Sequence, residues 1–125
     1  MTEEIEQTEQ VEIEVKNSIL NSIKKLLGIE STYTNFDTDI IMHINSVFVI
    51  LQQIGFGPKE GFSIIDASSV WSDYCDLDMI ETAKTYIYLR VRLLFDPPSN
   101  GAVMEAIKQT IQELEWRLNV GSDNT

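Results

Sequence analysis

The ten residues from Tyr86 to Phe95 place the strongest constraint on how this chain can fold. Eight of them are apolar or aromatic, and only Arg90 and Arg92 interrupt the run. In a helix, successive side chains point about 100° apart, so these residues would face almost every direction. A helix that is apolar on all sides has to be covered on all sides. The run therefore predicts a helix enclosed by other elements.

Two different partners could complete the cover of this helix. The neighbouring helices of a 125-residue chain enclose only part of it. The remainder needs either residues 56–75 folded over it or a neighbouring subunit, and the sequence leaves both open. Arg90 and Arg92 can lay their stems on apolar surface while their charged heads seek carboxylates. The candidate carboxylates are Asp73, Asp76, Glu113 and Glu115.

Helical periodicity recurs along the rest of the chain. Apolar residues repeat every three or four positions in each segment. Gly, Pro and capping residues mark the ends of these segments, and we expect Asp37 to be the N-cap of the second helix. We predict an all-α fold, a small bundle of about four helices, two of them long, with an irregular connection between the second and third helices. The expected helices are 17–27, 37–54, 77–95 and 100–118, and the irregular connection is 56–75.

Length and charge define the expected domain organisation. A chain of 125 residues supports one domain, which we place at residues 16–120, with a frayed end at 121–125. Residues 1–15 are expected to be a flexible acidic tail, since like charges repel and little apolar surface is available to bury. The alternation of Glu with branched apolar residues in 11–15 would also suit a short strand on a partner's edge. The tail carries Glu3, Glu4, Glu6, Glu9, Glu12 and Glu14.

Composition excludes several functions. The net charge of −11 argues against a grip on nucleic acid, because that affinity comes largely from Lys and Arg neutralising phosphates. No apolar run is long enough to cross a membrane, and the N-terminal residues do not resemble a secretory signal. Cys75 and His43 are the only cysteine and histidine, which leaves no metal-binding or catalytic constellation. We expect neither an enzyme nor a cofactor-binding protein.

Large aromatic and apolar side chains near the enclosed helix are the best candidates for subunit contacts. Trp, Tyr and Arg contribute most of the energy at protein interfaces. Trp116 also falls outside the apolar stripe of the last predicted helix, which indicates a second contact surface. The candidate interface residues are Trp71, Tyr74, Tyr86, Tyr88, Arg90, Arg92, Leu93 and Trp116.

Six stretches occur in an order that suggests a known family. They are Ile23–Ile29, Asp37–Asn45, Gly55–Pro58, Trp71–Tyr74, Tyr86–Pro98 and Glu113–Leu118. Together they make residues 17–120 resemble the small head–tail connector, or adaptor, proteins of tailed bacteriophages and of prophages in Gram-positive bacteria. No single stretch is diagnostic, and the joint order carries the resemblance. The acidic N-terminal extension is not part of the family pattern.

The resemblance implies a structural virion protein rather than an enzyme. Such a protein forms a homo-oligomeric ring, of twelve copies, beneath the portal protein at the neck of the particle, and is made in the host bacterial cytoplasm. The ring extends the channel through which DNA passes without specific binding, and it presents a docking face to a stopper or tail-completion protein. The resemblance carries over no catalytic or cofactor residues.

Two other functions remain open at this point. The chain could be a different phage assembly or tail-completion protein, or an acidic inhibitor that mimics DNA and occupies a nucleic-acid-binding surface. A DNA mimic would spread its carboxylates over a folded face, whereas six of the 20 acidic residues here precede residue 16.

Overall fold

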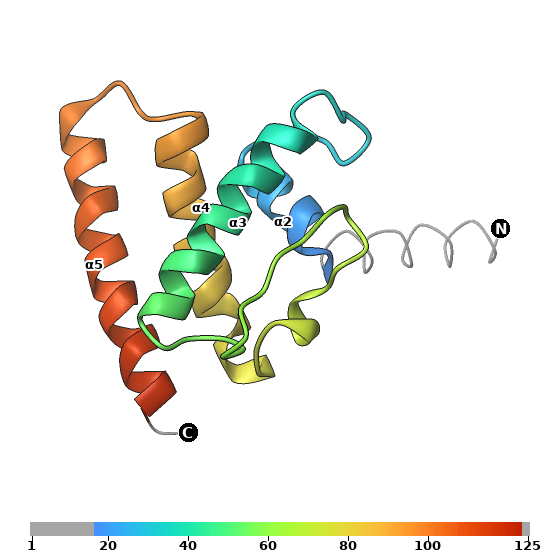
Figure 1. Ribbon diagram of the computed structural model, residues 1–125. Helices are drawn as coiled ribbons and strands as arrows, with labels where there is room; N and C mark the ends of the chain where they lie inside the picture. Colours follow the sequence, from blue (N-terminus) through green and yellow to red (C-terminus); the bar gives the residue numbers. More distant parts are fainter. Residues whose placement is uncertain (1–16, 124–125) are drawn as a thin grey trace, which may run out of the picture.

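The computed structural model describes residues 17–123, which form a bundle of four helices (Figure 1). These are α2 (Ile19–Leu26), α3 (Asp37–Gln53), α4 (Ile80–Phe95) and α5 (Gly101–Asp123), with single 3₁₀ turns at Trp71–Asp73 and Leu77–Met79. Within this range there is no β-strand, only an isolated antiparallel bridge between Ser18 and Val70. The predicted all-α bundle is confirmed. The predicted tail, residues 1–15, lies outside the described residues.

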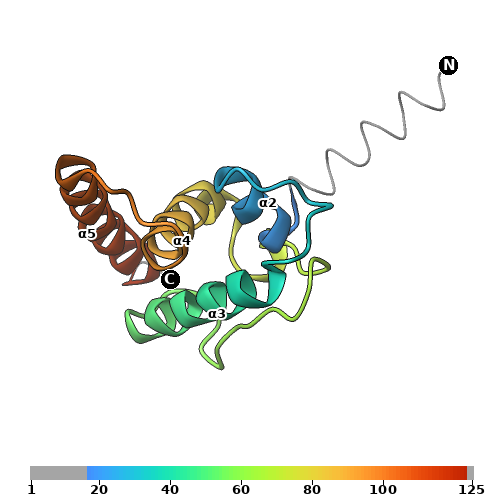
Figure 2. The same ribbon diagram turned by 90° about the horizontal axis from the view of Figure 1, so that it is seen from above.

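Helix α4 occupies the centre of the bundle. It packs most extensively against α3, and also against α5 and α2. Seen from above, α5 and α2 lie on opposite sides of α4, with α3 beneath them (Figure 2). The side chains of Ala83, Tyr86, Ile87 and Val91 are buried in this arrangement. The apolar helix α4 lies at the centre because its apolar side chains must be buried by other helices.

The first described helix begins at a capping serine. Ser18 Oγ accepts a hydrogen bond from the amide of Asn21 at 3.2 Å and donates one to the carbonyl of Ala67 at 2.8 Å. The helix ends where Gly28 adopts φ +82° and the amide of Ile29 returns to the Lys24 carbonyl at 2.8 Å. A glycine is the residue that enters this left-handed region without strain. The predicted stop at Gly28 is confirmed.

The predicted N-cap role of Asp37 is wrong. Phe36 occupies the cap position, and Asp37 is the first helical residue of α3. Its carboxylate instead forms an ion pair with Lys24 Nζ at 2.8 Å. Lys24 is completely buried, and its ammonium also donates to the carbonyls of Ser31 at 3.1 Å and Tyr33 at 2.7 Å. Lys24 of α2 thus holds both the loop that follows this helix and the first residue of α3.

The irregular segment between α3 and α4 folds back on its own chain. It runs from the end of α3 past α2 to the start of α4 (Figure 1). Asn45 of α3 pairs with both backbone groups of Ile64, accepting from its amide at 2.8 Å and donating to its carbonyl at 2.9 Å. Its side-chain amide therefore pairs with the Ile64 backbone as a neighbouring strand would, although residues 62–64 form no strand.

An aromatic cluster anchors the same segment to α3. The ring of Tyr74 lies with its centroid 4.6 Å from that of Phe48, 5.1 Å from that of Phe62 and 5.8 Å from that of Phe56. Aromatic pairs at such separations stabilise a core beyond the area they bury. Within the irregular segment, Trp71 begins the 3₁₀ turn Trp71–Asp73. The chain's own irregular segment therefore supplies cover to α2, α3 and the start of α4.

The last helix is longer than predicted. Asn100 Oδ1 accepts hydrogen bonds from the amides of Ala102 at 2.8 Å and Val103 at 3.2 Å, so Asn100 is the cap. The helix then continues to Asp123, past the predicted end near Leu118, and α3, α4 and α5 are all long, with 17, 16 and 23 residues. Its predicted apolar stripe faces α4, and Ile107, Ile111 and Leu118 are buried there.

Candidate assembly surfaces

A polar cluster joins α5 to α4 in the middle of an otherwise apolar contact. Tyr86 donates its hydroxyl hydrogen to Glu115 Oε1 at 2.8 Å, and Arg90 Nε donates to the Tyr86 hydroxyl at 2.7 Å. Arg90 also forms a direct ion pair with Glu115. Glu115 was one of the carboxylates that the sequence offered to Arg90. The cluster fixes the rotation of α5 on α4, because all three side chains must meet.

The protonation states of this cluster follow from its hydrogen bonds. Burial, and then the hydrogen bond to Glu115, raise the pKa of Tyr86 to about 12, so its hydroxyl stays a donor. Burial alone would raise the pKa of Glu115, but the hydrogen bonds from Arg90 and Tyr86 outweigh it and hold that pKa below its ordinary value. Burial would likewise lower the pKa of Arg90, and the same bonds raise it instead. Glu115 and Arg90 are therefore held as a charged pair.

Three of the predicted interface residues lie in the core of the single chain. Trp71 is 2% exposed, and its indole donates to Ser22 Oγ at 2.8 Å. Tyr74 and Tyr86 are buried as well. Burial, the largest cause, raises the pKa of the Tyr74 hydroxyl. These side chains meet their neighbours within the chain, so the surfaces open to another molecule are found elsewhere.

One open surface is the side of α4 between α2 and α5. Tyr88 and Arg92 are half-buried there. Leu93 is half-buried as well, but it points about 100° around the helix from Arg92, and Leu94 near the helix end is 57% exposed. A pocket of about 270 Å³ lies beside Tyr88 and Arg92, and its other wall is formed by Leu26, Leu27 and Gly28, with Asp96 at the helix end. Helix α4 is therefore enclosed on most sides by its own chain and left open on this one.

A second open surface is the outer face of α5. Trp116 is 67% exposed and Val120 is exposed one turn later. Trp116 follows Ile111 by five positions, which places it about 140° around the helix from the buried stripe. A tryptophan that is so largely exposed on a helix face is typical of a contact surface. Of the candidate interface residues, Trp116 therefore lies on an open face of α5, and Tyr88 and Arg92 lie on the open side of α4.

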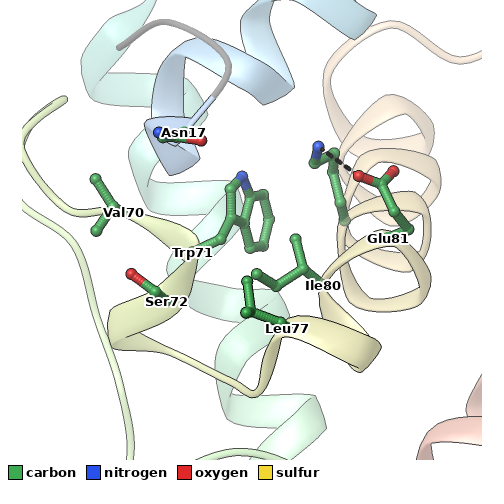
Figure 3. A pocket seen from close by; sticks show the side chains of 8 residues that line it. Asn17, Val70, Trp71, Ser72, Leu77, Ile80 and Glu81 are labelled. Atoms are coloured by element: carbon green, nitrogen blue, oxygen red, sulfur yellow. Dashed lines mark hydrogen bonds and ion pairs between the residues drawn. The ribbon is translucent and has the colours of Figure 1, made fainter. Parts of the chain in front are cut away.

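A third hollow lies where α2, the turn Trp71–Asp73 and α4 meet. It has a volume of about 380 Å³. Leu77 and Ile80 lie on one side of the Trp71 ring, and Glu81 lies farther along α4 (Figure 3). Lys84 pairs with Glu81 at 3.3 Å and approaches the Trp71 ring at 5.9 Å. The lining is mostly apolar, with Glu81 and Lys84 satisfying each other, so the hollow has no reactive group.

The chemical groups of the described residues do not form a reactive centre. Among residues 17–123, no three His, Cys, Asp or Glu side chains are grouped closely enough to hold a metal ion. Burial, the main cause, raises the pKa of Cys75 to about 11, so its sulfur is a thiol rather than a nucleophilic thiolate at neutral pH. Over the same residues, no helix combines the length and apolar content needed to cross a bilayer.

Comparison with known proteins decides the family. A family model described as phage connector protein matches residues 19–125, a range that contains every helix of the bundle. The chain belongs to this family. Neither a curated protein nor a solved structure matches it. As a phage connector it is a structural component of the virion that associates with other head or tail proteins. The restriction to phages of Gram-positive bacteria stays a prediction.

Several residues that shape these surfaces were missed by sequence reasoning. One of them is Lys24, a buried anchor with three partners. Asn45 sits at a polar position of α3, and only the fold brings Ile64 to it. For Lys24 a signal was available, since it follows Ile23 directly and Leu20 by four positions, and both of these residues are buried. For Asn45, no local pattern identifies a partner 19 residues away.

Proposed function

We propose that the chain is the subunit of a head–tail connector ring that assembles beneath the portal protein of a phage particle. The ring extends the DNA channel and presents a docking face to a stopper or tail-completion protein. The observation that carries this proposal is the family match over all four helices. Following the family resemblance, we take the number of copies to be twelve.

The positions of the two open surfaces support a ring. Rings form through head-to-tail contacts, in which one patch of a subunit meets a different patch of the next. The outer face of α5, with Trp116, and the open side of α4, beside α2, are two such unlike patches. Helices α5 and α2 lie on opposite sides of α4 (Figure 2). A subunit built in this way can offer Trp116 to one neighbour and the α2–α4 side to the other.

The charge of the chain supports passage of DNA rather than binding to it. The sequence has 20 acidic and nine basic residues. Of the described basic side chains, Lys24, Lys84, Arg90, Lys108 and Arg117 are paired with carboxylates of the same chain. Few cations remain to neutralise phosphates, so a channel lined by this protein would repel the DNA backbone.

Substitution of Trp116 tests the proposed contact. Trp116→Ala should leave the fold intact, because the side chain is 67% exposed. Loss of an aromatic interface anchor costs about 2 kcal/mol or more, which weakens each contact roughly 30-fold. Native mass spectrometry of the chain mixed with the portal protein of its phage should show fewer bound copies. A matched control is Ile65→Ala, which removes an 85% exposed side chain from the segment on the far side of α3.

Two results would count against the proposal. If Trp116→Ala joins the portal with unchanged stoichiometry and affinity, the outer face of α5 is not the subunit contact. If Ile65→Ala disrupts assembly as strongly as Trp116→Ala, the effect is not specific to α5. Circular dichroism spectra that match the unaltered chain establish that each variant is folded.

A further inference from the structure

The position of Trp116 along the bundle is fixed by its neighbours on α5. Glu115 accepts a hydrogen bond from Tyr86, and Gly121 lies against Met79. Trp116 follows Glu115 directly, so it lies level with the first two turns of α4, between Met79 and Tyr86. Its side chain is exposed on the outer face of α5.

The hollow beside Trp71 lies level with the same two turns, on the other side of α4. Lys84 lines this hollow and precedes Tyr86 by two positions, so it points about 200° around the helix from the contact with α5. Asn17, at the start of α2, lines the hollow too, and α2 and α5 flank α4 on opposite sides (Figure 2). The α4 residues in the lining are Ile80, Glu81 and Lys84.

The pocket beside Arg92 lies at a different height. Arg92 follows Lys84 by eight residues, which is about 12 Å farther along α4. Copies related by rotation about an axis along the bundle bring together patches of equal height. This geometry therefore favours the hollow beside Trp71 over that pocket as the counterpart of Trp116.

The hollow suits an aromatic side chain. Its volume is about 380 Å³, and clefts of about 300–1,000 Å³ hold drug-sized ligands, so an indole fits within it. Trp71, Leu77 and Ile80 give it apolar walls, and Leu77 is 83% exposed (Figure 3). Lys84, whose side chain is 13% exposed, adds a positive charge to the lining. Because an ammonium attracts the face of an aromatic ring, a tryptophan fills this hollow better than an aliphatic side chain does.

The charges beside the two patches are complementary. Glu81 is exposed at the hollow, and the adjoining turns expose three further carboxylates, those of Asp73, Asp76 and Asp78. On α5, Arg117 follows Trp116 and is exposed, with a pairing to Glu113 of its own helix at 2.7 Å. An exposed ion pair of this kind contributes little to stability, so Arg117 can turn to an acidic surface that approaches it.

We propose that Trp116 of one copy enters the Trp71 hollow of the next copy in the ring, while Arg117 meets the acidic residues around that hollow. The inference rests on the proposed function, because it names the two patches through which the subunits of that ring meet. It places the contact where α2 and α4 begin, and the occupant of the hollow is a second copy of this chain.

Cross-linking between copies tests the contact. In a Cys75→Ala background, one chain carries Val120→Cys, one turn after Trp116, and a second chain carries Ser72→Cys, an exposed position in the hollow. Since each chain has a single thiol, a bismaleimide that links the two different chains must join two copies. With both chains assembled on the portal protein of their phage, we expect a short bismaleimide to give such linked pairs.

The matched control replaces Ser72→Cys by Leu94→Cys. Leu94 is exposed but lies near the far end of α4, about 20 Å along the helix from Glu81, so this pair should lose the link. Native mass spectrometry of the same samples reports whether the ring forms. A ring that forms but links at Leu94 as well as or better than at Ser72, or at neither position, would overturn the inference and leave the ring itself standing. If no copies join the portal, the proposed function fails, and this inference fails with it.

A double-mutant cycle gives a second test. Leu77→Ala should weaken assembly on the portal roughly tenfold, whereas Ile65→Ala, which removes an equally exposed side chain outside the lining of the hollow, should not. In a chain that already carries Trp116→Ala, Leu77→Ala should weaken assembly by less than about threefold, because the two side chains act through one contact. If the two effects multiply in the double variant, Trp116 does not meet this hollow. Circular dichroism spectra that match the unaltered chain establish that the variants are folded.

Discussion

Lys24 offers the sharpest test of how the chain holds itself together. Its ammonium is fully buried and contacts Asp37 Oδ1 at 2.8 Å and the carbonyls of Ser31 and Tyr33 at 3.1 and 2.7 Å. Lys24→Met keeps most of the apolar stem and removes all three contacts. Breaking a buried ion pair by removing one partner costs about 3–5 kcal/mol. Asp37 is 26% exposed and lies in the first turn of α3, where the helix dipole favours an acid, so part of that cost is relieved.

We therefore expect Lys24→Met to lower the free energy of unfolding by about 2–3 kcal/mol. Urea denaturation followed by circular dichroism measures it, with an unchanged slope showing that the unfolded state is the same. The matched control is Lys25→Met, because Lys25 is the neighbouring residue, is exposed, and forms no ion pair within the described chain. That variant should change stability by less than about 0.5 kcal/mol. Equal effects of the two substitutions would refute the anchoring role of Lys24.

Two further predictions concern the α4–α5 contact and the aromatic cluster. Hydrogen bonds from Arg90 hold the pKa of Glu115 below its ordinary value of 4.5 despite burial. The pair therefore stabilises the fold above pH 4.5, and this stabilisation is lost as the pH falls through the lower pKa of the folded state. Glu115→Gln should remove this part of the acid dependence, which urea midpoints measured across this pH range would show. A Cβ on Gly57 would lie 2.8 Å from the Tyr74 ring, whereas one on Gly28 meets nothing within 4 Å, and both glycines have positive φ. Gly28→Ala should therefore cost about 1–2 kcal/mol from strain and Gly57→Ala about 1–3 kcal/mol more, and equal thermal shifts would contradict the close approach at Tyr74.

The helices were predictable because their signals are local. The run Tyr86–Phe95 with its two following prolines, and the positive-φ turn at Gly28, each determine structure within a few residues. The end of α5 was missed because residues 121–125 were expected to be a frayed end. The helix runs through Gly121, and the glycine lies against Met79, where an added Cβ would meet the methionine methyl at 3.1 Å. The close contact with Met79 explains why a glycine occupies this position, and no residue near Gly121 in the sequence predicts that contact.

The assembly surfaces were less predictable for a related reason. Size and aromatic character predict an interface role for Trp71 and Trp116 equally. The fold, however, buries Trp71 against Ser22 and exposes Trp116. What separated them in the sequence was periodicity, since Trp116 falls off the stripe that packs on α4, while Trp71 lies in a segment with no period at all.

The central claim, that this connector subunit forms a ring on the portal, is tested most directly by imaging the two proteins together. Purified chain mixed with the portal protein of its phage should give particles in electron microscopy with one added ring on the portal axis and the rotational symmetry of that ring. Native mass of the complex should correspond to twelve copies of a 14.3 kDa chain. A chain that remains monomeric in the presence of the portal, with no added density on its axis, would contradict the account.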